Sequence, residues 1–143
     1  MSENLDVVRS RGSEQVALVE RFCDAWSRRD PDGALSVVSS DVVYRPIASF
    51  AEVEECRGHD AVRRFFDGFW EAWADDAVWR LETARVYGDA VIALSRFSGH
   101  ARASGAEVTG GVFAVYRFRD GKIAQIEDFT DRAHALAAVG AEP

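Results

Sequence analysis

The alternation of hydrophobic and polar positions divides the chain into a helical first half and a strand-rich second half. Apolar residues within 16–26 recur at the three-to-four spacing of a helix with one buried face, with Ser13 before them as a candidate N-cap. Residues 1–12 are polar and aperiodic, which predicts a flexible leader. Asp30 and Pro31 suit the N-cap and first position of a short second helix, because the missing proline N–H costs nothing there.

A first strand and a third helix are predicted next. Residues 41–47 have the composition of a strand, and Pro46 favours an edge position because it cannot donate a hydrogen bond to a neighbouring strand. Residues 48–57 are expected to form a loop. A broad apolar stripe then predicts a helix that begins at Gly58. Its inward candidates are mostly aromatic: Val62, Phe65, Phe66, Phe69, Trp70 and Trp73.

Four strands and a short helix account for the rest of the chain. Two strands are expected at 77–87 and 90–103, and two more at 107–118 and 123–130, each pair joined by a tight turn that contains glycine and aspartate. A short helix at 132–139 is expected to end the chain. Helices gathered on one side of an antiparallel sheet make an α+β fold, here a single domain over residues 13–140.

Composition and charge narrow the function classes. The chain has 143 residues, of which 48% are hydrophobic and 29% charged, which is typical of a single globular domain. A net charge of −7 disfavours a nucleic-acid-binding surface. No apolar run is long enough to span a bilayer and the first residues do not resemble a signal peptide, so no membrane partner and a cytoplasmic location are expected. The two cysteines lack metal-ligand spacing, so neither a metal nor a cofactor is expected.

The most informative polar residue is Asp128, which lies inside a strand-like run in phase with Ile126. If Ile126 faces the core, the carboxylate does too, and a buried carboxylate needs a partner. Arg96 is in phase with Ile92 and Leu94, so it is expected to point inward and to pair with Asp128. The arginine would then hold the aspartate as a general base. The alternative is an ion pair that only joins two strands.

The aromatic residues favour a ligand cavity. The chain contains four tryptophans, nine phenylalanines and three tyrosines, many on expected inward faces, and rings of this kind either fill a core or line a pocket. His100 shares the expected face of Arg96, either as a proton carrier or as a solvated residue at the strand end. The candidate cavity residues are Trp26, Tyr44, Phe66, Trp70, Trp73, Trp79 and Ser98.

Three segments carry a family resemblance: residues 57–62, 118–123 and 127–133. They resemble the nuclear transport factor 2-like superfamily and, within it, the SnoaL-like (polyketide cyclase-like) group. This resemblance implies a cone-shaped, curved antiparallel or mixed sheet packed against three N-terminal helices, as in cystatin-like folds. It also implies a central pocket for a small apolar or polycyclic ligand, and a homodimer through the outer face of the sheet. The superfamily includes cyclases, isomerases and hydrolases, but also non-catalytic ligand-binding and assembly proteins.

Three branches of the superfamily differ in their acidic residues. In the limonene epoxide hydrolase branch, Arg96 and Asp128 match two members of an acid–arginine–acid site, but Ser98 stands in place of the second acid. In the ketosteroid isomerase branch the catalytic acid precedes a proline, and here that residue is Arg45. The polyketide cyclase branch uses a late-strand aspartate as base, a role that Asp128 fits. The resemblance therefore favours an enzyme based on Asp128 and leaves a binding protein as the alternative.

Overall fold

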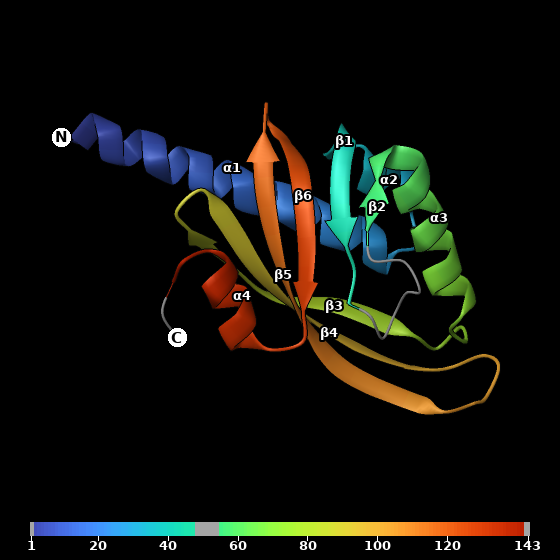
Figure 1. Ribbon diagram of the computed structural model, residues 1–143. Helices are drawn as coiled ribbons and strands as arrows, with labels where there is room; N and C mark the ends of the chain where they lie inside the picture. Colours follow the sequence, from blue (N-terminus) through green and yellow to red (C-terminus); the bar gives the residue numbers. More distant parts are fainter. Residues whose placement is uncertain (1, 48–54, 142–143) are drawn as a thin grey trace.

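A six-stranded mixed sheet in the order β2-β1-β6-β5-β4-β3 forms the centre of the protein (Figure 1). The computed structural model describes residues 2–47 and 55–141, with side chains from Gly12 onward. The strands are β1 (Val38–Arg45), β2 (Cys56–Arg57), β3 (Val78–Tyr87), β4 (Ala90–His100), β5 (Glu107–Arg119) and β6 (Lys122–Phe129). The helices are α1 (Ser2–Ser27), α2 (Pro31–Leu35), α3 (Gly58–Glu71) and α4 (Arg132–Ala138). The predicted α+β class, with a mixed sheet packed against three N-terminal helices, is confirmed.

Local sequence signals account for several of these boundaries. Asp30 caps α2 by accepting a hydrogen bond from the Gly33 N–H, and Pro31 occupies the first turn as predicted. The turn between β5 and β6 places both Asp120 and Gly121 at positive φ, 53° and 74°, which matches the twist of the flanking strands. The hairpins therefore form where the sequence predicted them.

Two predictions about the first half of the chain are wrong. The helix expected to begin at Ser13 begins at Ser2, because its backbone hydrogen bonding continues past Gly12, where α1 lies close to Val86 of β3. The flexibility expected of residues 1–12 stays a prediction. The strand that contains Tyr44 is not at the edge: β1 pairs in parallel with β6 and is flanked by β2.

The proline and the loop explain the second error. Pro46 lies one residue beyond β1, so its missing N–H takes no hydrogen bond out of the ladder. Of the loop expected at 48–57, residues 48–54 lie outside the described residues, and Cys56 and Arg57 form β2. A two-residue strand therefore occupies the edge position that the proline had suggested for β1.

Both faces of the sheet are covered, by different helices. The first three helices pack on the inner face, and Figure 1 shows α1 passing behind the sheet and α4 in front of it. On the outer face, Ala135 and Leu136 of α4 pack against Ala90, Ile92 and Val115. The run from Ala90 to Ala93 is consequently buried on both faces of β4. Two separate apolar clusters follow from this arrangement, one on each side of the sheet.

A β-bulge in β3 decides which of its side chains face each side. Leu81 pairs with Ser95, but two residues later Thr83 pairs with Leu94, so the register shifts around Glu82. A bulge of this kind inserts an extra residue and turns the following side chains to the other face. Trp79 before the bulge therefore faces the inner cluster, whereas the alternate residues from Thr83 onward face α4.

Candidate functional site

The inner cavity is built around Asp128 on β6. Asp128 alternates with buried Ile126 and faces the inner side of the sheet, as the sequence predicted. Its Oδ2 accepts a hydrogen bond from the Tyr44 hydroxyl at 2.5 Å. Because Tyr44 and Ile126 are register partners in the parallel β1–β6 ladder, the phenol reaches across one strand spacing to the carboxyl two residues further along. Strand pairing thus fixes the geometry of this hydrogen bond.

Burial changes the acid–base properties of the pair. Removal from water raises the pKa of Asp128 from 3.8 to about 7; the hydrogen bond from Tyr44 opposes that rise, and the nearby Glu127 carboxylate adds to it. Burial and the adjacent Asp128 raise the pKa of Tyr44 well above 10, so the phenol keeps its proton and remains a donor. Near neutrality the carboxyl therefore exists both with and without its proton, as a group that exchanges protons requires.

The cavity beside Asp128 is small and mostly aromatic. Its volume is about 20 Å³, which is enough for roughly one water molecule. Trp26 lines it and has a buried Nε1–H that no described residue accepts as a hydrogen bond. A buried donor without a partner is costly, so an acceptor oxygen within hydrogen-bonding distance of this N–H would be stabilised. The lining residues are Phe22, Cys23, Trp26, Tyr44, Trp79, Ser95, Val112, Ala114, Tyr116, Ile126 and Asp128.

Three polar residues in this lining were not singled out as site residues in the sequence. Cys23 is buried, and its Sγ lies 3.5 Å from the Tyr116 hydroxyl. Burial raises the pKa of the Cys23 thiol to about 11, so the thiol is protonated at neutral pH. Ser95 is only 4% exposed and alternates with Ala93 and Phe97 on the inner face. Ser95 is thus in the opposite phase to Arg96, and it was missed because the phase of Arg96 was taken as the inner one.

The predicted pairing of Arg96 with Asp128 is wrong. Arg96 faces the outer side of the sheet, where its Nε lies 3.0 Å from Glu82 Oε2 and its side chain is half exposed. Ile92, with which it is in phase, is buried under α4 and not in the inner core. Arg96 and Ile92 therefore do share a face, as predicted, but it is the outer face of the sheet.

The same reasoning removes two further candidates from the inner site. Ser98 lies on the outer face and lines a separate surface hollow together with Arg96. His100 is exposed, and its Nδ1 lies 2.6 Å from Asp76 Oδ2. The cavity that contains Asp128 is therefore not lined by Arg96, Ser98 or His100.

The aromatic candidates divide into cavity and core. Trp26, Tyr44 and Trp79 line the cavity, whereas Phe66, Trp70 and Trp73 pack behind it without lining it. The Phe66 ring meets Trp26 edge-on at 4.7 Å between centroids, and Trp73 lies 4.5 Å from Phe97. Arg29 places its guanidinium 4.5 Å from the Trp70 ring centroid. These three rings support the cavity wall.

Within residues 12–47 and 55–141, whose side chains the structure describes, no cluster of three or more His, Cys, Asp or Glu side chains is arranged to hold a metal ion. None of the helices in this part of the chain has the length and apolar character needed to cross a membrane. The polar groups around the cavity are thus a carboxyl, two phenols, a thiol, a hydroxyl and the tryptophan N–H groups.

Comparison with known proteins gives one family and several similar folds. The family model of the SnoaL-like domain matches residues 19–126. None of the curated proteins matches the chain. A nuclear transport factor 2-like protein from Burkholderia thailandensis is 28% identical, with a TM-score of 0.73 over 89% of this chain and 96% of the other.

Two other solved structures show the same fold at lower identity. A protein described as a SnoaL-like polyketide cyclase from Jannaschia sp. is 19% identical, with a TM-score of 0.72 over 92% of this chain and 95% of that one. TerC, co-crystallised with polyporic acid, is 18% identical, with a TM-score of 0.70 over 90% of this chain and 99% of TerC. The fold expected from the sequence resemblance is therefore confirmed.

Proposed function

Because the chain belongs to the SnoaL-like domain family, we propose that it is an enzyme acting on a small apolar or polycyclic molecule, with Asp128 as general base. One observation carries this proposal: a buried carboxyl whose pKa is about 7 lines an aromatic cavity. A base is most effective when its pKa lies near the working pH. Groups shifted by burial in this way are more frequent at functional sites than elsewhere.

The proposed step is proton abstraction from the substrate. Tyr44 occupies Oδ2 of Asp128, which leaves Oδ1 to take the proton from a carbon or hydroxyl group of the substrate. Tyr44 continues to donate during this transfer because burial keeps its phenol protonated. The proton on Asp128 then returns to the product at another atom, so the carboxylate is restored. General base catalysis of this kind contributes on the order of a hundredfold to ten-thousandfold in rate.

Trp26 is proposed to bind the substrate oxygen on which negative charge develops. Its buried Nε1–H has no acceptor among the described residues, and a hydrogen bond to a charged oxygen is stronger than one to a neutral carbonyl. The aromatic walls suit a flat, apolar body. Two similar structures point to the same class of molecule, one described as a polyketide cyclase and the other crystallised with polyporic acid.

Access to the cavity requires movement, because about 20 Å³ accommodates no organic substrate. Trp79 is the wall residue proposed to move. It lies on β3 next to the bulge and is only half-buried, whereas Trp26 is 4% exposed. Displacing a half-buried ring costs less burial than displacing one in the core.

The small cavity also favours a second candidate function, a non-catalytic ligand-binding or assembly protein of the same fold. In that case Tyr44 and Asp128 satisfy each other inside a packed core and no proton is transferred. The two candidates differ in what happens to a bound ketone: an enzyme exchanges its acidic protons with solvent, whereas a binding protein leaves them in place.

The experiment uses tetralone, a bicyclic ketone, in deuterated water. Proton NMR would follow deuterium incorporation at the carbon next to the carbonyl, and the tryptophan fluorescence of the protein would report binding. We expect the wild-type protein to accelerate exchange and Asp128→Asn to lose that acceleration while still binding tetralone. Binding without exchange by the wild-type protein would favour the second candidate. Equal exchange rates for both proteins would refute the role of Asp128.

Oligomeric state and cellular location remain predictions from the sequence. A homodimer through the outer face of the sheet predicts a solution mass near twice the 15.8 kDa of one chain, measurable by light scattering. A cytoplasmic location predicts that the tagged protein fractionates with cytoplasmic markers.

A further inference from the structure

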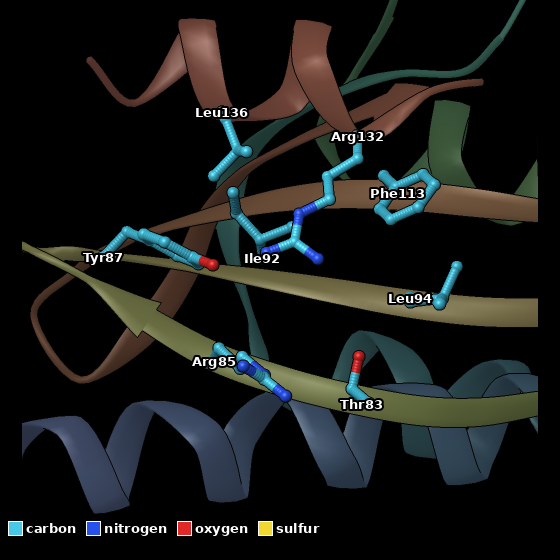
Figure 2. A pocket seen from close by; sticks show the side chains of 8 residues that line it. All are labelled: Thr83, Arg85, Tyr87, Ile92, Leu94, Phe113, Arg132 and Leu136. Carbon is cyan, nitrogen blue, oxygen red and sulfur yellow. The ribbon is translucent and has the colours of Figure 1, made fainter. Parts of the chain in front are cut away.

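We propose a second ligand site, on the outer face of the sheet, that binds a small aromatic carboxylate. The site is the hollow enclosed by β3, β4, β5 and α4 (Figure 2). It is on the opposite side of the sheet from Asp128 and shares no lining residue with the inner cavity. The inference therefore does not depend on the proposed function.

The bulge in β3 and the register of the sheet assemble this site. Beyond the bulge, Thr83 pairs with Leu94 and Arg85 pairs with Ile92, so these four side chains share the outer face. Leu94 in turn pairs with Phe113 of β5. Without the extra residue in β3, the side chains of Thr83 and Arg85 would face the inner core instead.

The helix α4 covers this part of the sheet with two side chains one turn apart. Leu136 is buried against the outer-face cluster, and Arg132 lies four residues before it on the same side of the helix. Figure 2 shows Arg132 reaching from α4 down over Ile92, with the hydroxyl groups of Tyr87 and Thr83 turned toward the same space. The site thus has an apolar floor and a polar rim.

The size of the hollow suits one ring. Its volume is about 140 Å³, and its floor consists of Ile92, Leu94, Phe113 and Leu136. For comparison, an engineered apolar cavity of about 150 Å³ in another protein is known to bind benzene. A single aromatic ring therefore fits the apolar part of the site, and the open side leaves room for a polar substituent.

The charge of the rim specifies an anion. Arg85 and Arg132 both line the hollow, and neither has an ion pair or hydrogen bond with any described residue. By contrast, Arg96, Arg102 and Arg119 are each paired with an acid. Guanidinium groups bind carboxylates through parallel hydrogen bonds. An aromatic carboxylate would place its ring on the apolar floor and its charge beside Arg85 and Arg132.

A second copy of the chain is a poorer occupant of this hollow. If a two-fold axis passed through the hollow, the same lining would face itself, and that lining contains two arginines and no acid. Like charges would then face each other across the axis, which disfavours association. A dimer through the outer face would have to use a part of the sheet away from α4.

Benzoate is the probe that tests the site, with benzyl alcohol as its neutral counterpart. Calorimetric titration of the full chain should give saturable binding of benzoate and at least tenfold weaker binding of benzyl alcohol. Arg85→Met and Arg132→Met keep the apolar stem and remove the charge, so each should weaken benzoate binding about tenfold or more. Arg80→Met is the matched control, because Arg80 is an exposed arginine on the same strand that does not line the hollow.

Several results would overturn the proposal. These are the absence of saturable benzoate binding, equal affinity of the methionine variants and the wild-type protein, and equal affinity for benzyl alcohol. Loss of benzoate binding in Asp128→Asn would place the probe in the inner cavity instead. If a methionine variant fails to fold, Arg132→Glu provides an independent test, because it should weaken benzoate binding and allow the cation benzylamine to bind. A benzoate-dependent change in mass by light scattering would point to a second copy as the occupant.

Discussion

Replacing Asp128 with asparagine should stabilise the protein at high pH. Asparagine keeps the size of the side chain and can still accept the hydrogen bond from Tyr44, but it has no proton to lose. In the wild-type protein the pKa of Asp128 is about 7 when folded, against an ordinary value of 3.8. Between these values the unfolded chain has lost the proton and the folded chain still holds it. The free energy of unfolding therefore falls as the pH rises through this range, and this contribution is constant above about pH 7.

The size of the effect follows from the two pKa values. At 1.36 kcal/mol for each pH unit, the interval from 3.8 to about 7 corresponds to about 4 kcal/mol. As the pH rises from about 4 to about 8, the free energy of unfolding of the variant should therefore increase by up to about 4 kcal/mol relative to that of the wild-type protein. Other titrating groups, including Asp41 with its lowered pKa, are common to both proteins and cancel in the difference.

Urea unfolding of both proteins across this pH range measures the difference directly. Asp67→Asn is a matched control, because Asp67 is exposed on α3 and its carboxyl stays in water. The control should follow the pH profile of the wild-type protein. If the difference between Asp128→Asn and the wild-type protein stays the same at every pH, the reasoning is refuted, since Asp128 would then titrate alike in the folded and unfolded chains.

Three further predictions concern a hydrogen bond, a close approach of two chain segments and a buried thiol. Tyr44→Phe removes the donor to Asp128, so the pKa of Asp128 should rise further above 7 in a carboxyl NMR titration; a fall would contradict the role of this hydrogen bond. Gly99→Ala would place a Cβ 2.8 Å from the Cβ of Ala77 and should lower the free energy of unfolding by about 1–3 kcal/mol. Gly110→Ala has no atom within 4 Å of its new Cβ and should cause no such clash, so equal urea midpoints for the two variants would refute this prediction. Cys23, with a pKa of about 11 through burial, should resist a thiol reagent until the chain unfolds, and rapid labelling of the native protein would contradict its burial.

Much of the fold was predictable because local signals and global packing agree. The proline and aspartate at the start of α2 and the aspartate–glycine turn between β5 and β6 specify their structures through backbone chemistry alone. Asp128 faces inward because it alternates with Ile126, which is buried as expected. In each case one physical preference determines one position.

The error at Arg96 arises because alternation identifies two faces without saying which one meets the larger core. The run from Ala90 to Ala93 is apolar without interruption, and such runs are typical of strands buried on both sides. Ser95 lies in the opposite phase to Arg96, so the same ambiguity between the two faces left it out of the predicted site. The bulge at Glu82 and the cavity of about 20 Å³ depend on tertiary packing of rings from several elements, which no local pattern specifies.

Asp128 is proposed to exchange a proton near neutral pH inside the aromatic cavity. Carbon NMR of the side-chain carboxyl, assigned by comparison with Asp128→Asn, measures this property without knowledge of the substrate. We expect a titration midpoint at about 7. A midpoint near the ordinary value of 3.8 would contradict it, because the carboxylate would then remain ionised throughout the neutral range, too weak a base for the proposed step.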